Sequence, residues 1–504
     1  MQPLNKESLY DRCIENNIEK RPEKVALIFK NKEYTFQQLK QEIETYEILY
    51  KHQGVQKNDR IIILGKNSDV FIIQVFVCLK LGAIFVPIAE NTQDYKLQYI
   101  LENSNSKYIF HVCENKLLKN LYYDEKKCSM GLKNRKDWGC IIYTSGSTLL
   151  PKGVLEPLSS MIYVVEKINE SLKNSADDII LVGLPLSFDY GLYQFFLSYS
   201  VGATVVLLEE FGLIHKLPYY ICKYNVTAIP LVPSVFALLL KCKRMNMVNM
   251  NSVRYICSTG DVLQVGLIME FHRDFPDIDI IPMYGLTECK RVFIMPKNKW
   301  EKVMAGSCGV PLDGICIKIE NEYGEEVDIE EKGELVIYGK NVMYGYWNNE
   351  VETNKRFFLN GIQRGVKSGD IFYQDRDGYY YFCGRKEYYI KRRGIKVSPV
   401  EIEMIISKIS GVRQCIVVGY SDEIEGEKIL VVIVKDRNAS LRKEDLCEQL
   451  NKLPYEMRPA KIVISKDELP RTSNGKYDRK AIEGFIKNHG IECGRDENEC
   501  IICK

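Results

Sequence analysis

Short apolar runs of strand length alternate with longer helical stretches up to about residue 380, and this alternation constrains the fold more than any other feature. Residues 60–64 (RIIIL) form one apolar run, residues 68–81 follow with a helical pattern, and residues 82–87 (GAIFVP) form the next run. The same kind of run recurs at residues 178–184, 203–208, 228–231 and 255–258. Strands separated by helices in this way are typical of α/β layers with largely parallel sheets.

The pattern changes in the second part of the chain. From Gly306 onward, short runs joined by Gly, Asn and Asp turns predict a small β subdomain with strands at residues 315–319, 333–338 and 379–383. After about residue 386, helical and strand-like runs alternate again, which predicts a separate α+β unit. We expect its helices and strands at residues 399–409, 412–419, 429–435 and 441–450.

The charge balance and the apolar segments exclude several classes of protein. The 69 Lys and Arg residues nearly match the 67 Asp and Glu residues, which argues against a broad nucleic-acid surface or a polybasic membrane patch. The N-terminal segment is polar and carries no apolar run of the signal-peptide type. The longest apolar stretch, residues 70–89, is interrupted by Gln, Lys, Gly and Pro. We therefore expect a cytoplasmic protein without nucleic-acid or membrane partners.

The 17 cysteines are scattered and accompany no secretion signal. Reduced thiols, several of them acting as small buried hydrophobic groups, are therefore expected rather than a disulfide framework. Cys493, Cys500 and Cys503 cluster near the end of the chain, but their spacing matches no standard zinc pattern. This favours a flexible tail with free thiols, and a metal or redox site is the alternative.

The sharpest local motif is a Ser- and Thr-rich segment directly after the apolar run 140–142. It has the sequence YTSGST over residues 143–148 and continues as LLPKGV over residues 149–154. Small residues and hydroxyl groups after a strand, closed by Pro-Lys-Gly, suit a mobile loop whose backbone N–H and hydroxyl groups hold phosphate oxygens. The segment is not the GxxxxGK[ST] loop, and a simple Ser/Thr-rich turn is the alternative.

Further motifs follow in order along the chain: MYGLTE at residues 283–288, KSGD at 367–370, GR at 384–385 and PRTSNGK at 470–476. Taken together, they resemble the adenylate-forming superfamily, which includes acyl-CoA synthetases, luciferases, and the adenylation domains and ligases of nonribosomal peptide synthesis. The resemblance extends from about residue 34 to residue 480. It implies a large N-terminal domain over residues 1–385, a smaller mobile C-terminal domain over residues 386–488 and a tail over residues 489–504.

The resemblance also implies a reaction in two steps. A carboxylate attacks the α-phosphate of ATP, releasing pyrophosphate and leaving an acyl-AMP, and a thiol then displaces AMP to give a thioester. Because the first step brings two anions together, its transition state needs positive charge and orientation rather than a protein nucleophile. The implied cofactors are ATP and Mg²⁺.

Individual residues receive roles from the matching motifs. Lys476 would bridge the substrate carboxylate and the phosphate oxygens, Thr287 would hydrogen-bond the α-phosphate, and Glu288 would hold Mg²⁺. Tyr284 would stack on adenine, and Asp370 would accept hydrogen bonds from the ribose, assisted by Arg385. The other expected nucleotide-binding residues are Thr144, Ser145, Gly146, Ser147, Thr148, Lys152, Gly260 and Gly285. Asp370 as a turn residue and Arg385 as a surface ion-pair partner are the structural alternatives.

Three positions depart from the family pattern. Glu387 stands at the expected hinge, where members carry Asp or Lys. Leu149 replaces the first glycine of the loop motif, which is costly if that position needs a positive φ. Leu158 replaces a histidine near the carboxylate pocket, five residues after Gly153. For Leu149 we expect altered loop dynamics rather than inactivity, and Leu158 weakens the analogy with the substrates of family members.

The segment PLSFDYGLYQ at residues 185–194 resembles the family's substrate pocket. Asp189 matches the carboxylate that pairs with the α-ammonium group of an amino acid, and a carboxylate in an apolar pocket needs such a cation. Asp189 as a helix cap is the alternative, and some acyl-CoA ligases also carry Phe-Asp-Tyr here. Tyr190, Tyr193 and Met283 would help to line the pocket. Lys290 and Arg291 either reach an anionic substrate group or pack outside the pocket.

These observations predict a ligase that activates a small carboxylic acid, with an amino acid as the favoured class, and loads it onto a separate carrier protein. The sequence ends 28 residues after Lys476, too few for a fused carrier domain, so we expect the carrier to bind in trans. An acyl- or aryl-CoA ligase that uses free CoA is the first alternative. An inactive adenylate- or carrier-binding homologue, suggested by Leu149 and Leu158, is the second.

Overall fold

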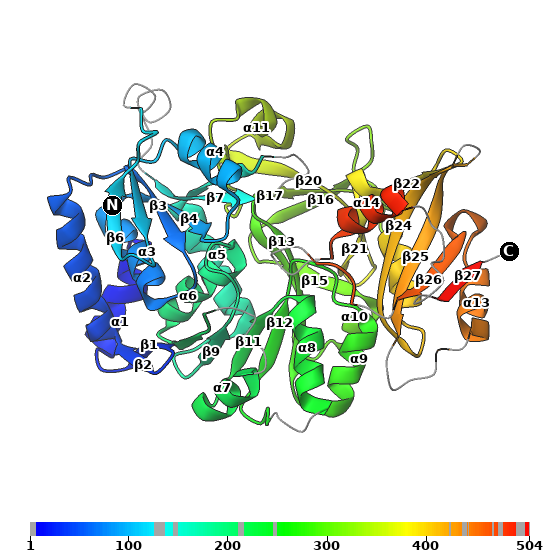
Figure 1. Ribbon diagram of the computed structural model, residues 1–504, viewed down its shortest axis with the longest axis horizontal. Coiled ribbons are helices and arrows are strands. Elements are labelled where there is room, and N and C mark those ends of the chain that lie inside the picture. Colours follow the sequence, from blue (N-terminus) through cyan, green and yellow to red (C-terminus); the bar gives the residue numbers. More distant parts are fainter. Residues whose placement is uncertain are drawn as a thin grey trace.

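The computed structural model describes residues 7–124, 137–144, 150–209, 216–244, 249–422, 425–435, 441, 443–465, 468–471, 477–489 and 499–502. A large N-terminal part built on two sheets is followed by a smaller part with its own sheet, seen at the right of Figure 1. This is the α/β arrangement of a large and a small domain that the alternating pattern predicts.

The first sheet follows the order β18-β8-β7-β4-β3-β5-β6, and its central strands β5, β3, β4 and β7 are parallel. Its strands are β3 (Arg60–Gly65), β4 (Ile84–Ala89), β5 (Tyr108–His111), β6 (Lys116–Lys119), β7 (Trp138–Thr144), β8 (Lys152–Pro157) and β18 (Gly345–Tyr346). β7 and β8 form the antiparallel hairpin that flanks the Ser/Thr-rich loop, and residues 145–149 of this loop lie outside the described ranges.

The second sheet is parallel at one end and antiparallel at the other. Its parallel strands are β1 (Val25–Phe29), β9 (Ile179–Val182), β10 (Thr204–Leu207), β11 (Ala228–Leu231), β12 (Tyr255–Ser258) and β13 (Asp279–Leu286), with β2 (Lys32–Thr35) antiparallel at the edge. The antiparallel end contains β14 (Lys290–Ile294), β15 (Ser307–Pro311), β16 (Cys316–Glu320), β17 (Gly333–Tyr338), β19 (Phe357–Asn360), β20 (Gln363–Gln374) and β21 (Tyr380–Arg385). The predicted small β subdomain is thus continuous with the parallel sheet, because β13 pairs with both β12 and β14.

Helices fill the space between these sheets and cover their outer faces. Two nearly all-apolar helices, α3 (Asp69–Leu81) and α6 (Asp189–Val201), lie between the sheets: α3 contacts β3 and β4, and α6 contacts β9 and β10. The ring of Phe76 on α3 meets that of Phe196 on α6 at 6.0 Å. α3 begins where the Ser68 hydroxyl accepts from the Phe71 N–H at 3.1 Å and ends at Gly82, whose φ of 67° favours glycine. Its bounds confirm the helix predicted over residues 68–81.

The remaining N-terminal helices are a π-helical turn η1 (Asp11–Glu15), α1 (Asn16–Lys20), α2 (Phe36–His52), α4 (Asp94–Ser104), α5 (Leu158–Leu172), α7 (Leu217–Tyr224), α8 (Pro233–Arg244), α9 (Val265–Asp274), α10 (Trp300–Ala305) and α11 (Glu350–Arg356). Leu158 opens α5 and packs against the core between the sheets instead of lining the cavity described below. Its apolar side chain therefore serves packing at this position.

The C-terminal part begins where the chain leaves the second sheet at Arg385 and enters the third at Ile390, through the short 3₁₀ turn η4 (Lys386–Tyr388). Its core contains buried Ile402, Ile406 and Val431. Its elements are β22 (Ile390–Arg392), β23 (Ile395–Val397), α12 (Pro399–Ile406), β24 (Val412–Asp422), β25 (Gly426–Lys435), α13 (Lys443–Asn451), the 3₁₀ turn η5 (Tyr455–Met457), β26 (Lys461–Ser465), α14 (Arg479–His489) and β27 (Glu499–Ile502).

The end of the chain differs from the flexible tail that its composition predicts. Residues Glu499–Ile502 form β27, which pairs antiparallel with β26 in the register Lys461↔Ile502 to Ile464↔Glu499. An edge strand carries unpaired N–H and C=O groups, and β27 forms backbone hydrogen bonds with those of β26. Cys493 and Cys503 lie outside the described ranges.

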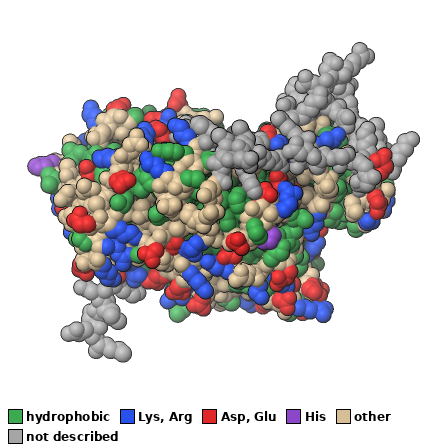
Figure 2. Space-filling view, turned by 90° about the horizontal axis from the view of Figure 1, so that it is seen from below, with side chains coloured by type: hydrophobic (Ala, Val, Ile, Leu, Met, Phe, Trp, Pro, Cys, Tyr) green, Lys and Arg blue, Asp and Glu red, His purple; other side chains and the backbone are tan. Residues whose placement is uncertain are grey.

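Charged side chains of both signs share the surface (Figure 2), and several cysteines lie in the core. Figure 2 shows basic and acidic side chains interspersed over the face in view. Twelve cysteines whose side chains the structure describes are free thiols, and Cys78, Cys140, Cys257 and Cys289 among them are buried. Within the same residues, every helix is too short or too polar to cross a bilayer.

Candidate active site

A cavity of about 1760 Å³ lies where the second sheet meets the C-terminal part. Its wall contains the carboxyl ends of parallel strands, the position at which ligands bind in α/β sheets. Fourteen of the residues predicted from the motifs line it: Thr144, Lys152, Asp189, Tyr190, Tyr193, Gly260, Met283, Tyr284, Gly285, Thr287, Glu288, Asp370, Arg385 and Glu387. Ser145, Gly146, Ser147, Thr148 and Lys476 lie outside the described residues.

The β13–β14 hairpin positions the MYGLTE motif in this wall. Tyr284 and Gly285 flank a bulge, and a Cβ atom on Gly285 would overlap the Lys290 carbonyl, so only glycine fits. Lys290 has a φ of 55°, a left-handed conformation that costs about 1–3 kcal/mol for such a residue. The surrounding contacts therefore hold the hairpin in a strained form at the cavity.

Tyr284, Asp370 and Arg385 line the cavity together and are joined by a hydrogen bond and an ion pair. The Tyr284 hydroxyl donates to Asp370 Oδ2 at 2.6 Å, and Arg385 Nε lies 3.3 Å from Asp370 Oδ1. Asp370 is only 2% exposed, and this burial raises its pKa although Arg385 and Tyr284 oppose the shift. The Tyr284 ring packs against Phe372 at 4.7 Å and Phe382 at 6.3 Å. These contacts fix the ring and the carboxylate relative to each other.

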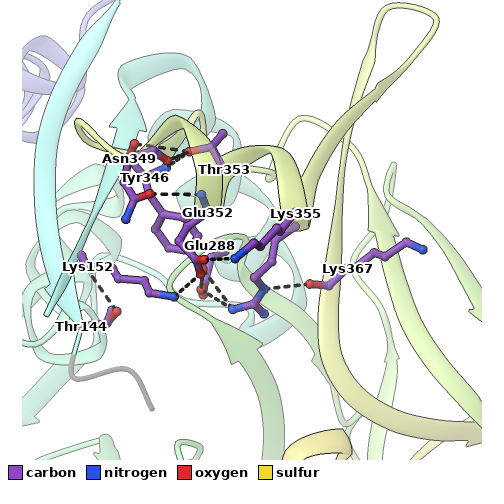
Figure 3. Close-up of polar contacts among 10 residues, drawn as sticks. Thr144, Lys152, Glu288, Tyr346, Asn349, Glu352, Thr353, Lys355 and Lys367 are labelled. Atoms are coloured by element: carbon purple, nitrogen blue, oxygen red, sulfur yellow. Dashed lines mark hydrogen bonds and ion pairs between the residues drawn. The ribbon is translucent and has the colours of Figure 1, made fainter. Parts of the chain in front are cut away.

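The Glu288 carboxylate is held by two residues that the sequence analysis did not identify. Tyr346 donates its hydroxyl to Glu288 Oε1 at 2.5 Å, and Arg356 Nη1 donates to the same oxygen at 2.9 Å. Arg356 also bonds the carbonyls of Lys367, at 3.1 Å, and Ser368. Figure 3 shows this group around Glu288. No local pattern marks Arg356, because it belongs to a short charged helix that resembles a solvated one.

Lys152, at the start of β8, faces the cavity but is already paired. Its ammonium lies 2.6 Å from Glu352 Oε2 and 5.4 Å from the centre of the Tyr346 ring, as Figure 3 illustrates for the ion pair. Hydrogen bonds from Lys152 and Lys355 lower the pKa of Glu352 to about 2. The Thr144 hydroxyl donates to the Lys152 carbonyl at 3.4 Å across the hairpin. A bound phosphate would compete with Glu352 for this lysine.

The most unexpected feature is a buried charge cluster around Asp189, the first residue of α6. Lys290 Nζ lies 3.1 Å from Asp189 Oδ2 and also donates to Glu156 Oε1, while Tyr193 donates its hydroxyl to Glu156 Oε2 at 2.7 Å. Burial would raise the pKa of Asp189, but Lys290, Arg291 and a hydrogen bond from Thr287 lower it below its usual value. The carboxylate of Asp189 is therefore ionised and has a lysine as partner.

The structure also shows which of the two alternatives for Lys290 and Arg291 holds. Both line the cavity, and neither packs outside it. Sequence analysis missed Glu156, a fully buried carboxylate in β8, because its lysine partner is 134 residues away.

The segment that follows Lys476 reaches the cavity from the C-terminal part. Tyr477 lines the wall, and its N–H donates to Asp261 Oδ2 at 3.1 Å, one residue after Gly260. Gln264 Nε2 donates to the Cys415 carbonyl at 3.1 Å and joins the two parts further. Glu387 is exposed between the two sheets. The C-terminal part thus brings the residue next to Lys476 to the part of the cavity wall that contains Gly260 and Asp261.

The residues present are compatible with a Mg²⁺ ion that is bound mainly by phosphates. Among the described residues, no group of three or more His, Cys, Asp and Glu side chains is arranged to hold a metal. Glu288 uses one carboxylate oxygen for Tyr346 and Arg356, and its other oxygen is suited to Mg²⁺. This fits the usual Mg²⁺ site of one carboxylate plus substrate phosphates.

Comparison with known proteins adds a family and several relatives. The profile of the family described as AMP-binding enzyme matches residues 14–347, and that of the AMP-binding enzyme C-terminal domain matches residues 401–476. Tyrocidine synthase 2 from Brevibacillus parabrevis is 27% identical over 94% of this chain, which spans only 14% of that protein. The probable CoA ligase CCL5 from Humulus lupulus is 26% identical, over 88% of this chain and 87% of its own length.

A solved structure has the same architecture with a bound intermediate. The o-succinylbenzoate CoA synthetase from Bacillus subtilis, in complex with its acyl-adenylate, is 25% identical and has a TM-score of 0.79. The alignment covers 95% of this chain and 99% of that one.

Proposed function

We propose that this chain, which belongs to the family of AMP-binding enzymes and is an AMP-forming ligase, activates an amino acid and transfers it to the thiol of a carrier protein. In the first step the substrate carboxylate attacks the α-phosphorus of ATP, and the bond to pyrophosphate breaks. In the second step a thiol sulfur loses its proton to solvent and attacks the acyl carbon, and AMP leaves.

The observation that carries the amino-acid assignment is the imbalance of charge beside Asp189. Two carboxylates, Glu156 and Asp189, share the single ammonium of Lys290. Glu156 is fully buried, whereas Asp189 is 9% exposed and lines the cavity. A second cation supplied by the substrate would complete the pairing of Asp189, and an α-ammonium group is such a cation.

The nucleotide would lie in the same cavity, beside Asp370. We propose that Asp370 accepts hydrogen bonds from the ribose, with Tyr284 beside the adenine and Arg385 near the ribose or the phosphate. Lys152, together with the hydroxyl groups of residues 144–148, would bind the β- and γ-phosphates, and Lys476 would reach the reacting carboxylate. Bound Mg²⁺ supplies positive charge to the phosphates, and Glu288 is the residue that would hold it.

The thiol acceptor is proposed from the relatives. The match to tyrocidine synthase 2 supports a carrier protein, and the match to a probable CoA ligase makes free CoA the competing acceptor. Glu387 is exposed between the second and third sheets. A rotation of the C-terminal part at this residue would switch the enzyme from adenylate formation to thioester formation.

The deciding experiment is substrate-dependent ATP–pyrophosphate exchange with amino acids and with the matched acids that lack the amino group. Exchange with an amino acid, reduced by Asp189→Asn while AMP binding is unchanged, is the expected result. Equal exchange with the acid that lacks the amino group would exclude the ammonium role of Asp189. Thioester formation on a phosphopantetheinylated carrier but not on CoA would support a carrier protein as the acceptor. Thioester formation on CoA but not on the carrier would contradict it.

A further inference from the structure

We infer that the activated amino acid carries a carboxylate on its side chain and that Arg291 is the residue that binds this group. The inference rests on the proposed activation of an amino acid and names the substrate class within it. It is carried by a guanidinium group that lines the cavity without an anionic partner.

The position of Arg291 is set by strand β14 and by two contacts. Its Nη1 donates to the Thr259 hydroxyl at 2.8 Å, and the guanidinium carbon lies 5.1 Å from the centre of the Tyr190 ring. Thr259 follows the carboxyl end of β12, and Tyr190 belongs to the first turn of α6. Arg291 therefore sits on the same side of the cavity as Asp189, the proposed ammonium partner.

Arg291 lacks the counter-ion that its environment requires. Within the part of the chain that the structure describes, its Nε is buried without a hydrogen-bond partner, and no carboxylate oxygen lies within 4.0 Å of its nitrogens. Arg291 helps to lower the pKa of Asp189, but the Asp189 carboxylate is hydrogen-bonded to Lys290. Partly burying a cation without an anion is unfavourable, and a substrate anion would relieve the cost.

A second polar group in the cavity wall, one residue before the Thr259 that Arg291 bonds, is also unsatisfied. Ser258, which precedes Thr259, lines the cavity, is 3% exposed, and its hydroxyl has no partner among the described residues. The Arg291 Nε–H can only donate, and the Ser258 hydroxyl is able to donate. A carboxylate, which only accepts hydrogen bonds when ionised, matches this pair better than an amide or a cation.

The other cation of the cluster is not available for this role. Lys290 is 7% exposed and already lies between Glu156 and Asp189. Glu156 and Asp189 both lie within ion-pairing distance of Lys290, and in the described part of the chain neither carboxylate forms an ion pair with Arg291. Lys152 and Lys476 would balance the α-carboxylate and the phosphates, which leaves Arg291 for the side chain.

The test compares acidic amino acids with their neutral amides. ATP–pyrophosphate exchange would be measured for aspartate against asparagine, and for glutamate against glutamine, with wild type, Arg291→Gln and Arg291→Lys. The dicarboxylates succinate and glutarate, which lack the amino group, complete the panel. Arg273→Gln is the matched control, because this arginine is 74% exposed on α9 outside the cavity wall.

We expect one acidic amino acid to exceed its amide in kcat/KM, and Arg291→Gln to lower kcat/KM for the acid about tenfold to a hundredfold, mainly through KM. The value for the amide stays unchanged, Arg291→Lys recovers part of the loss, and Arg273→Gln has no effect. AMP binding and the melting temperature of each variant show whether it is folded, and Arg291→Lys keeps the charge if Arg291→Gln does not fold.

Each contrary result separates this inference from the proposed function. A neutral amino acid that is activated best and is unaffected by Arg291→Gln would overturn the side-chain assignment and leave amino-acid activation intact. Equal losses for acid and amide, with a raised KM for ATP, would move Arg291 to the nucleotide and also overturn it. Succinate or glutarate used as well as the amino acid, with the loss in Arg291→Gln retained, would support Arg291 and overturn the amino-acid assignment.

Discussion

Lys290 Nζ lies 3.1 Å from Asp189 Oδ2, and both groups are buried in the wall of the cavity. The carboxylate that the sequence assigns to the substrate's ammonium group thus has a cation of the chain itself as a partner. Glu156 holds the same lysine from the other side. The three side chains form a fixed charge pattern that exists before any substrate binds.

Removing this lysine is expected to destabilise the protein. Lys290→Met leaves Glu156 and Asp189 facing each other without a cation, and breaking a buried ion pair in this way costs about 3–5 kcal/mol. Urea unfolding measures the loss. Lys297→Met is the control, since its pair with Asp279 is 3.7 Å long and partly exposed, and it is expected to change stability by less than about 0.5 kcal/mol.

A double variant distinguishes an electrostatic cause from a loss of packing. Adding Glu156→Gln to Lys290→Met removes one of the two uncompensated charges, so part of the stability returns. A double variant as unstable as the sum of the single changes would contradict the electrostatic cause.

The proposed contact between Asp370 and the ribose predicts that nucleotide binding depends on pH, with a definite sign. Burial raises the pKa of this carboxyl group, so it takes up a proton at a higher pH than an ordinary aspartate does. Only the ionised carboxylate accepts hydrogen bonds at both oxygens. Affinity for AMP is therefore expected to fall as the pH is lowered through this raised pKa, and isothermal titration calorimetry at a series of pH values measures it.

Asp370→Asn is the control for this dependence. The variant binds AMP about tenfold more weakly near neutral pH and loses the decline at low pH. A variant that keeps the wild-type pH profile would assign the dependence to another group.

Sequence alone predicts the layered fold because its cause is local. Apolar runs such as residues 60–64 and the capped helix α3 form from neighbouring residues, and their periodicity is visible in the printed sequence. The motifs also identify the residues that line the cavity, because Tyr284 and Thr287 lie within one hairpin. Element ends shift by a few residues, as in α12, which ends at Ile406 instead of residue 409.

The partners of the site residues could not be predicted, because they come from distant parts of the chain. Glu156, Asp189 and Lys290 belong to β8, α6 and β14, and a buried lysine has the same local sequence signature as an exposed one. Arg356 reaches Glu288 across 68 residues. Strand β27 was missed for a similar reason, since only the free edge of β26 makes it a strand.

The end of the chain is expected to protect the C-terminal sheet. Truncation after His489 removes β27 and leaves the edge of β26 open to solvent. Hydrogen–deuterium exchange of residues 461–465 is then expected to become faster, while exchange in β12 of the N-terminal sheet stays the same. Unchanged protection of β26 would mean that β27 contributes nothing to this sheet in solution.

The pair formed by Lys152 and Glu352 is expected to compete with ATP for the lysine. Glu352→Gln frees the ammonium of Lys152 from a partner at 2.6 Å, so ATP affinity should rise by a few-fold, about 0.5–1 kcal/mol. Lys152→Gln should weaken ATP binding instead, and both affinities are measured by calorimetry.

The same ion pair also affects stability. Because the pKa of Glu352 is lowered to about 2, the pair stabilises the folded state above the unfolded pKa of about 4.3. This contribution, under about 1 kcal/mol for a partly exposed pair, is lost as the pH falls from about 4 towards 2 and is absent in Glu352→Gln. A lower ATP affinity in Glu352→Gln would instead identify Glu352 as a residue that positions Lys152 for the phosphates.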